Sequence, residues 1–143
     1  MKLLSLEKHN YHVTAVIETK AGEDFCPLTE FLSDKENGQY SGSVDGFYSL
    51  IELFAASGRE ALNDKQCHYI HKKEKIWEFI KGDLRVCWFY PGKDKIIICS
   101  HGFVKQGQKA DKKEVNKALK IKKAFEAQKD NIEIIEEDQD NGD

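Results

Sequence analysis

Apolar residues recur at helical spacing in two long segments of the chain. In residues 44–57 they fall at i, i+3, i+4 and i+7, which predicts a helix that buries Phe47, Ile51 and Phe54 along one stripe. Residues 112–128 have the same period and predict a second helix with lysines on its outer side. A short third helix is expected from Asp24 to about Leu32. Residues suited to cap the helix starts are Asp24, Ser43, and Asp111 with Glu114.

Four segments rich in β-branched and aromatic residues predict strands, at 11–19, 76–80, 84–90 and 95–100. The last three are separated by short turn signals, so they should be consecutive antiparallel neighbours. Residues 84–90 and 95–100 are apolar on both faces and should lie inside the sheet. The element order is therefore β-α-α-β-β-β-α, and the predicted fold is α+β, a small antiparallel sheet with helices on one face.

Length and composition predict one domain over residues 1–130, followed by an acidic tail over 131–143 that is mobile unless its Ile132–Ile135 patch docks on the domain. No apolar run approaches the roughly 18–20 residues of a membrane span, and the apolar patch at the start is too short for a signal peptide. The four cysteines form no C-x-x-C pair. A protein of the reducing cytoplasm, without contact to a membrane, is the simplest interpretation.

Charge is distributed unevenly along the chain. Residues 68–123 carry 15 lysines and arginines against six acidic residues, although the whole chain has a net charge of -3. A basic segment of this kind can hold a polyanion by neutralising its charge, and RNA is the candidate considered first.

Candidate chemistry centres on Arg85, because no motif for metal, nucleotide or serine-hydrolase chemistry is present. Arg85 begins an apolar strand, and it is either a strand-end residue in a salt bridge or a rigid guanidinium that binds phosphate. His101 is expected to be a hydrogen-bonded histidine at a strand end. Cys67, His68 and His71 lack a fourth zinc ligand at suitable spacing and are interpreted as a polar connector.

Several short motifs, taken together in their order, resemble the RelE/ParE superfamily of toxin–antitoxin toxins, and most closely its HigB-like, phage-associated branch. The similarity spans about residues 69–125, and the predicted elements upstream match the architecture of the family. The motifs are Trp77-Glu78, Leu84-Arg85-Val86-x-Trp88-Phe89, Ile96-Ile97-Ile98, His101-Gly102-Phe103-x-Lys105 and Glu114-x-x-x-Ala118.

This resemblance implies a ribosome-dependent endoribonuclease that cuts messenger RNA and needs neither metal nor cofactor. Arg85 would hold the scissile phosphate, Lys105 would act similarly, and His101 fits the general base chemically. The expected partners are the ribosome, messenger RNA and an antitoxin of the helix-turn-helix type. The lysines placed to contact RNA are Lys72, Lys73, Lys81, Lys109, Lys112 and Lys113.

Two positions depart from the pattern of the branch. Ile80 stands where an arginine is common, and Gln106 stands where a second lysine is common, which weakens a two-arginine clamp. Two alternatives therefore remain open. One is a ParE-like toxin that inhibits gyrase, and the other is a catalytically degenerate binding protein of a phage or mobile element.

Overall fold

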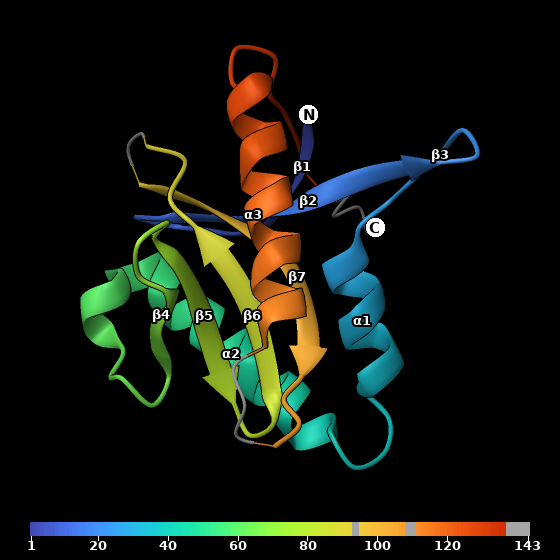
Figure 1. The fold of residues 1–143 in the computed structure, drawn as a ribbon. Coiled ribbons are helices and arrows are strands. Elements are labelled where there is room, and N and C mark those ends of the chain that lie inside the picture. Colours follow the sequence, from blue (N-terminus) through green and yellow to red (C-terminus); the bar gives the residue numbers. More distant parts are fainter. Residues whose placement is uncertain (93–94, 108–110, 137–143) are drawn as a thin grey trace, which may run out of the picture.

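The computed structural model describes residues 1–92, 95–107 and 111–136, which build a mixed sheet of eight strands and three long helices (Figure 1). The α+β class predicted from the sequence is confirmed. The elements in chain order are β1 (Lys2–Lys8), β2 (His12–Lys20), β3 (Glu23–Phe25), α1 (Pro27–Lys35), α2 (Ser41–Ser57), the 3-10 turn η1 (Arg59–Ala61), β4 (Cys67–His71), β5 (Ile76–Lys81), β6 (Leu84–Phe89), β7 (Ile96–Val104), α3 (Lys112–Ala127) and β8 (Glu133–Glu136).

The centre of the sheet is the predicted antiparallel meander. β5 pairs with β6 and β6 with β7, so β6 lies inside the sheet. The prediction of a small antiparallel sheet is wrong. The sheet has eight strands, and its order β4-β5-β6-β7-β2-β1-β8 includes the parallel pairs β2–β7 and β1–β8, while β3 pairs with β2. The predicted element order is likewise wrong, since it lacks β1, β3, β4 and β8. Each of these is short or partly polar and is held by its neighbour in the sheet.

Helices cover both faces of the sheet, and the prediction of helices on one face is therefore wrong (Figure 1). α1 and α2 pack on the face that carries Ile97, whereas α3 packs on the face that carries Ile98. Both of these neighbouring residues are fully buried. Cover on both faces explains why β6 and β7 are apolar at successive positions.

Helix α2 buries the predicted stripe, since Phe47, Ile51 and Phe54 are each at most 1% exposed. Burial of each such side chain stabilises the fold by about 1.5–3 kcal/mol. The helix ends at Gly58, as predicted, where a φ of 82° favours glycine. It begins earlier than predicted, so Ser43 lies within the helix and is not its cap.

The side chains of the other two predicted caps do not bond the helix backbone, although Asp111 does stand directly before α3, as predicted. Asp24 lies in β3, where its carboxylate accepts a bond of 2.7 Å from Lys2 Nζ, and α1 begins only at Pro27. Proline suits the first turn of a helix because it needs no partner for an amide hydrogen there. At α3, the Asp111 and Glu114 side chains bond Lys105 and His101 instead of the helix backbone.

The two ends of the described chain lie against each other. Residues 133–136 form β8 and pair with β1, so these four residues belong to the sheet and not to a mobile tail. The Met1 amine donates to Asn131 O and to Gln128 Oε1, both at 2.9 Å. The rest of the predicted tail, residues 137–143, lies outside the described residues. In the described part, no helix is both long and apolar enough to cross a membrane.

Candidate functional site

Arg85 lies at the beginning of β6, on the face that α3 covers in part, and its guanidinium is fixed in place. One terminal nitrogen donates to Gly82 O at 2.7 Å and to Leu84 O at 3.1 Å. Its Nε lies 3.8 Å from Glu78 Oε1. The side chain is 16% exposed, so its hairpin and a neighbouring carboxylate hold it rigid at the edge of solvent.

Glu78 lies between Arg85 and His68, a residue that the sequence analysis interpreted as part of a polar connector. The carboxylate is 9% exposed and its second oxygen lies 2.6 Å from His68 Nε2. His68 is 46% exposed and pairs directly with Glu78 across β4 and β5. The three side chains come from adjacent strands, and we call them the polar triad: His68, Glu78 and Arg85.

The polar triad combines a base, an orienting group and a cation. If His68 donates its Nε2 hydrogen to Glu78, its Nδ1 is the proton acceptor of the neutral ring. A buried carboxylate fixes the orientation of such an imidazole, while the guanidinium fork suits two phosphate oxygens. The arrangement is therefore able to accept a proton beside a bound phosphate. One signal was present in the sequence, because Glu78 is the single acid in the apolar segment 76–80.

His101 was predicted to lie at a strand end, and this is wrong. It lies inside β7, which continues to Val104. It is 2% exposed, with Nε2 at 3.0 Å from Glu114 Oε1 and Nδ1 at 3.0 Å from Ser100 Oγ. Burial lowers the pKa of His101, and the nearby Lys117 lowers it further. This placement agrees with the interpretation of His101 as a hydrogen-bonded histidine.

Lys105 follows β7 directly and lies near the hairpin that holds Arg85. Its backbone nitrogen donates to Asp83 O at 2.7 Å, and its Nζ lies 2.8 Å from Asp111 Oδ2. The Lys105 side chain is 25% exposed. It thus contributes a cation at the end of the sheet where Arg85 lies, although Asp111 neutralises part of that charge.

The lysines predicted to contact RNA form two groups at opposite ends of β5. Lys81 ends β5 and its side chain lies across α2 at Gly46, while Lys112 and Lys113 begin α3. The second group is Lys72 and Lys73, in the exposed turn between β4 and β5. Six strand residues span about 20 Å, so one compact ligand cannot contact both groups, whereas an extended strand can. Lys109 lies outside the described residues.

A shallow groove of about 560 Å³ is lined by residues of α1 and α3 and of the end of β7. Its charged lining mixes both signs, with Lys35, Lys113, Lys117, Asp34, Asp111 and Glu114. Because the lining carries three acids beside three lysines, the groove is not a purely basic surface for a polyanion.

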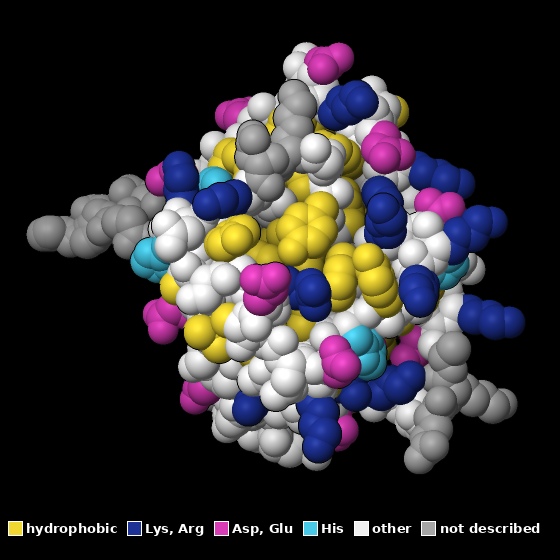
Figure 2. All heavy atoms as spheres, turned by 90° about the vertical axis from the view of Figure 1, so that its left-hand side faces the viewer, with side chains coloured by type: hydrophobic (Ala, Val, Ile, Leu, Met, Phe, Trp, Pro, Cys, Tyr) yellow, Lys and Arg dark blue, Asp and Glu magenta, His cyan; other side chains and the backbone are white. Residues whose placement is uncertain are grey.

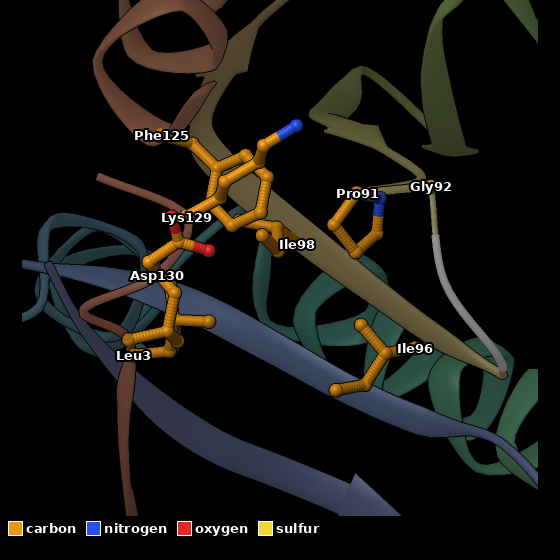
Figure 3. Close-up of a pocket in the computed structure, with 9 residues that line it drawn as sticks. Leu3, Pro91, Gly92, Ile96, Ile98, Phe125, Lys129 and Asp130 are labelled. Atoms are coloured by element: carbon orange, nitrogen blue, oxygen red, sulfur yellow. The ribbon is translucent and has the colours of Figure 1, made fainter. Parts of the chain in front are cut away.

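A second cavity, of about 440 Å³, lies under the far end of α3 and is mostly apolar (Figure 3). Figure 3 shows Phe125, Ile98 and Leu3 around it, with Lys129 and Asp130 at its rim. The 16 residues of α3 span roughly 24 Å, which places this cavity far from the residues at the beginning of the helix. It therefore does not form part of a site with the polar triad.

The cysteines contribute to packing. All four are buried, and burial raises the pKa of Cys67 to about 12, so its thiol stays protonated at neutral pH. Its side chain belongs to the core under α2, whereas His68 faces the opposite side of β4. Within residues 1–92, 95–107 and 111–136, no group of three or more histidine, cysteine or acidic side chains is arranged to hold a metal ion.

Comparison with known proteins finds a family model that matches the chain. The family model described as "Phage derived protein Gp49-like (DUF891)" matches residues 41–123, which is more than half of the chain. The match runs from the start of α2 into α3 and contains the whole polar triad and Lys105. No curated protein matches the sequence at a significant level.

Proposed function

Since the chain belongs to the Gp49-like family of phage-derived proteins, we propose that it is the toxin of a type II toxin–antitoxin system, of the RelE/HigB kind. Its activity would be that of a ribosome-dependent, metal-independent endoribonuclease that cuts messenger RNA and thereby stops translation. The observation that carries this proposal is the polar triad, with Arg85 held rigid beside the exposed imidazole of His68.

The proposed reaction is an attack of the 2′-hydroxyl of RNA on the adjacent phosphate. His68 Nδ1 takes the proton of the hydroxyl, the new O–P bond forms, and the bond to the 5′ oxygen breaks. That oxygen takes a proton from water, so the products are a cyclic phosphate and a 5′-hydroxyl end. Arg85 binds the phosphate and stabilises the charge that develops on its oxygens.

Two further groups have supporting roles in this proposal. Glu78 is a positioning residue, because it orients His68 and shares its other oxygen with Arg85. Lys105 and the lysines at the beginning of α3 lie at the same end of the sheet and would neutralise neighbouring phosphates. His101, which is buried, would support the strand and take no part in proton transfer.

The proposal also requires partners. A toxin of this kind must be silenced in the cell that makes it, so a cognate antitoxin should bind the chain and cover or distort the polar triad. The ribosome would place the message against His68 and Arg85. Strong expression of the chain alone should therefore arrest growth, and co-expression of the antitoxin should restore it.

The direct test is primer extension on messages bound to ribosomes in a purified translation system. We expect new 5′ ends to appear on addition of the chain and to be absent with His68→Ala or Arg85→Ala. Arrest of growth without message cleavage, together with inhibited supercoiling by purified gyrase, would identify a ParE-like toxin instead. If the folded protein neither cuts messages nor inhibits gyrase, it is a degenerate binding protein.

A further inference from the structure

A second cluster of aromatic and basic side chains lies at the β4 edge of the sheet, on the face that carries α2. The Tyr69 ring stacks on the Trp77 ring with centroids 3.9 Å apart, and Trp77 stacks on Trp88 at 5.3 Å. Tyr90 meets the Trp77 and Trp88 rings edge-on, at 6.5 and 5.1 Å. We call Tyr69, Trp77, Tyr90 and Arg59 the aromatic platform.

The platform is anchored in the core and open at its surface. Trp88 is fully buried, whereas Tyr69 is 37% and Tyr90 is 38% exposed. Figure 2 views the molecule from the side of the β4 edge and shows hydrophobic side chains gathered near the centre of this face, with basic and acidic side chains among and around them. Exposed aromatic groups on a rigid base are unusual enough on a soluble surface to suggest a binding role.

A cation lies directly against one of these rings. The Arg59 guanidinium carbon lies 4.7 Å from the centre of the Trp77 ring. Among the described residues, Arg59 makes no ion pair with a carboxylate. Burial raises the pKa of Tyr90, and the positive charge of nearby Arg59 lowers it in part, which is consistent with Arg59 lying close to that ring.

We propose that the aromatic platform binds unpaired nucleobases of single-stranded RNA, with Tyr69 and Tyr90 stacking on bases and Arg59 binding a phosphate. Rings on a sheet with arginine beside them are the usual means of holding single strands without reading their sequence. The chemistry fits RNA better than a protein partner, because the platform combines flat π surfaces with a guanidinium that no described carboxylate neutralises.

The aromatic platform lies close enough to the polar triad for one RNA strand to contact both. Tyr69 and His68 are successive residues of β4, and they face opposite sides of the sheet. β4 is an edge strand, so no further strand separates the two surfaces. This inference rests on the proposed function for its choice of ligand, and it deepens that function by adding a second contact to the same message.

Binding can be measured without ribosomes and without cleavage. The probe is a fluorescein-labelled, pyrimidine-rich single-stranded RNA of about ten nucleotides, followed by fluorescence anisotropy at low salt. The variants are Tyr69→Leu with Tyr90→Leu, which keeps apolar bulk but removes both rings, and Arg59→Gln. The matched control is Tyr48→Leu, since Tyr48 is 44% exposed on α2 and about 15 Å of helix separates it from Arg59.

We expect the double variant to weaken RNA binding at least about ten-fold, because each stacked base contributes substantially to affinity. Arg59→Gln should weaken binding and reduce its dependence on salt, and Tyr48→Leu should bind like the native chain. Circular dichroism and melting temperature confirm that each variant is folded. A native chain without affinity for the probe, or folded platform variants with native affinity, would overturn the inference.

The same variants separate this inference from the proposed function. His68→Ala should lose message cleavage and keep its affinity for the probe. A native chain that binds the probe through its tyrosines but never cuts messages would refute the proposed function and leave the inference standing. Platform variants that lose the antitoxin and keep the probe would show that the surface is a protein contact, which refutes the inference alone.

Discussion

The two arginines of the chain lie in opposite kinds of surroundings. Arg85 is held by two backbone carbonyls and lies beside the carboxylate of Glu78, so the orientation of its guanidinium is fixed within the protein. Arg59 lies over the Trp77 ring, among tyrosines, and no described carboxylate pairs with it. One guanidinium is fixed in a polar cluster, while the other rests on an aromatic surface.

This difference suggests that the two arginines have separate roles on the same sheet. A charge that is already oriented stabilises a transition state without reorganising during the reaction. A charge that rests on aromatic rings adds affinity for a ligand of the same chemical class but does not need a fixed reaction geometry. Variants at the two sites should therefore separate the rate of cleavage from the affinity for RNA.

The largest expected effect is at His68. His68→Ala should lower the rate of cleavage by on the order of 10²–10⁴, because a general base in the right position contributes that much. The measurement is the single-turnover rate on messages bound to ribosomes. His9→Ala is the matched control, since His9 is 52% exposed and also lies 3.0 Å from a glutamate. Equal losses for both variants would contradict the assignment of His68.

Arg85 should have the next largest effect. Arg85→Ala should slow cleavage by on the order of 10²–10³, and Arg85→Lys should restore only part of it, because an ammonium lacks the fork. The melting temperature should also fall, since Glu78 loses a partner at a cost of about 1–2 kcal/mol.

The comparison with Arg59 decides how that result is interpreted. Arg59→Gln should weaken binding of the RNA probe. At a saturating concentration of the protein, its single-turnover rate of cleavage should stay close to that of the native chain. If folded Arg85→Ala cleaves messages at the native rate, Arg85 has only the structural role that its ion pair with Glu78 also permits.

The sequence predicted the local part of this picture. The β5–β6–β7 meander, α2 and α3 follow from periodicity and short turns, and Arg85 was correctly placed on a central strand. The parallel pairing of β2 with β7 depends on residues more than 80 positions apart, and no local pattern encodes it. His68 was missed because its role appears only when β4 pairs with β5.

His101 was misplaced for a different physical reason. The strand was predicted to end at residue 100, but β7 continues to Val104, and α1 approaches it closely at Gly102. A Cβ at Gly102 would lie 2.6 Å from the Phe31 ring. Glycine thus leaves space for the helix, and His101 is enclosed within the strand instead of ending it.

Gly102→Ala tests whether cleavage depends on the packing of α1 against the sheet. Its added methyl group would press on Phe31 and Leu28, on the face opposite Arg85, and should lower stability by about 1–3 kcal/mol. Cleavage by the folded fraction should stay near native. Gly42→Ala is the control, because nothing lies within 4 Å of its added atom and it should be neutral or slightly stabilising. Urea unfolding measures both variants.

The smallest expected effect is a pH dependence of stability at His101. Because burial lowers its pKa, the unfolded chain binds a proton below about pH 6.5 that the native chain does not, so stability falls as the solution is acidified. The contribution is at most about 1.4 kcal/mol per pH unit. Lys117 strengthens this effect and Glu114 opposes it.

His101→Gln should remove this contribution and flatten the acid side of the stability curve. Part of the slope should remain, because burial also lowers the pKa of His12. Urea unfolding at a series of pH values from mildly acidic to neutral measures the slope. An unchanged slope would mean that His101 takes up its proton equally well in both states.

The parallel pairing of β2 with β7 has a consequence for the rate of folding. The β4–β7 meander joins neighbours in sequence and can form quickly, whereas His12 reaches Ile96 only after a long loop has closed. Loop closure of that length makes the pairing of β2 a slow step. In the folding chain, the strands that carry His68, Glu78 and Arg85 can therefore assemble before the sheet is complete, and the barrier to the native state should lie in attaching the N-terminal strands.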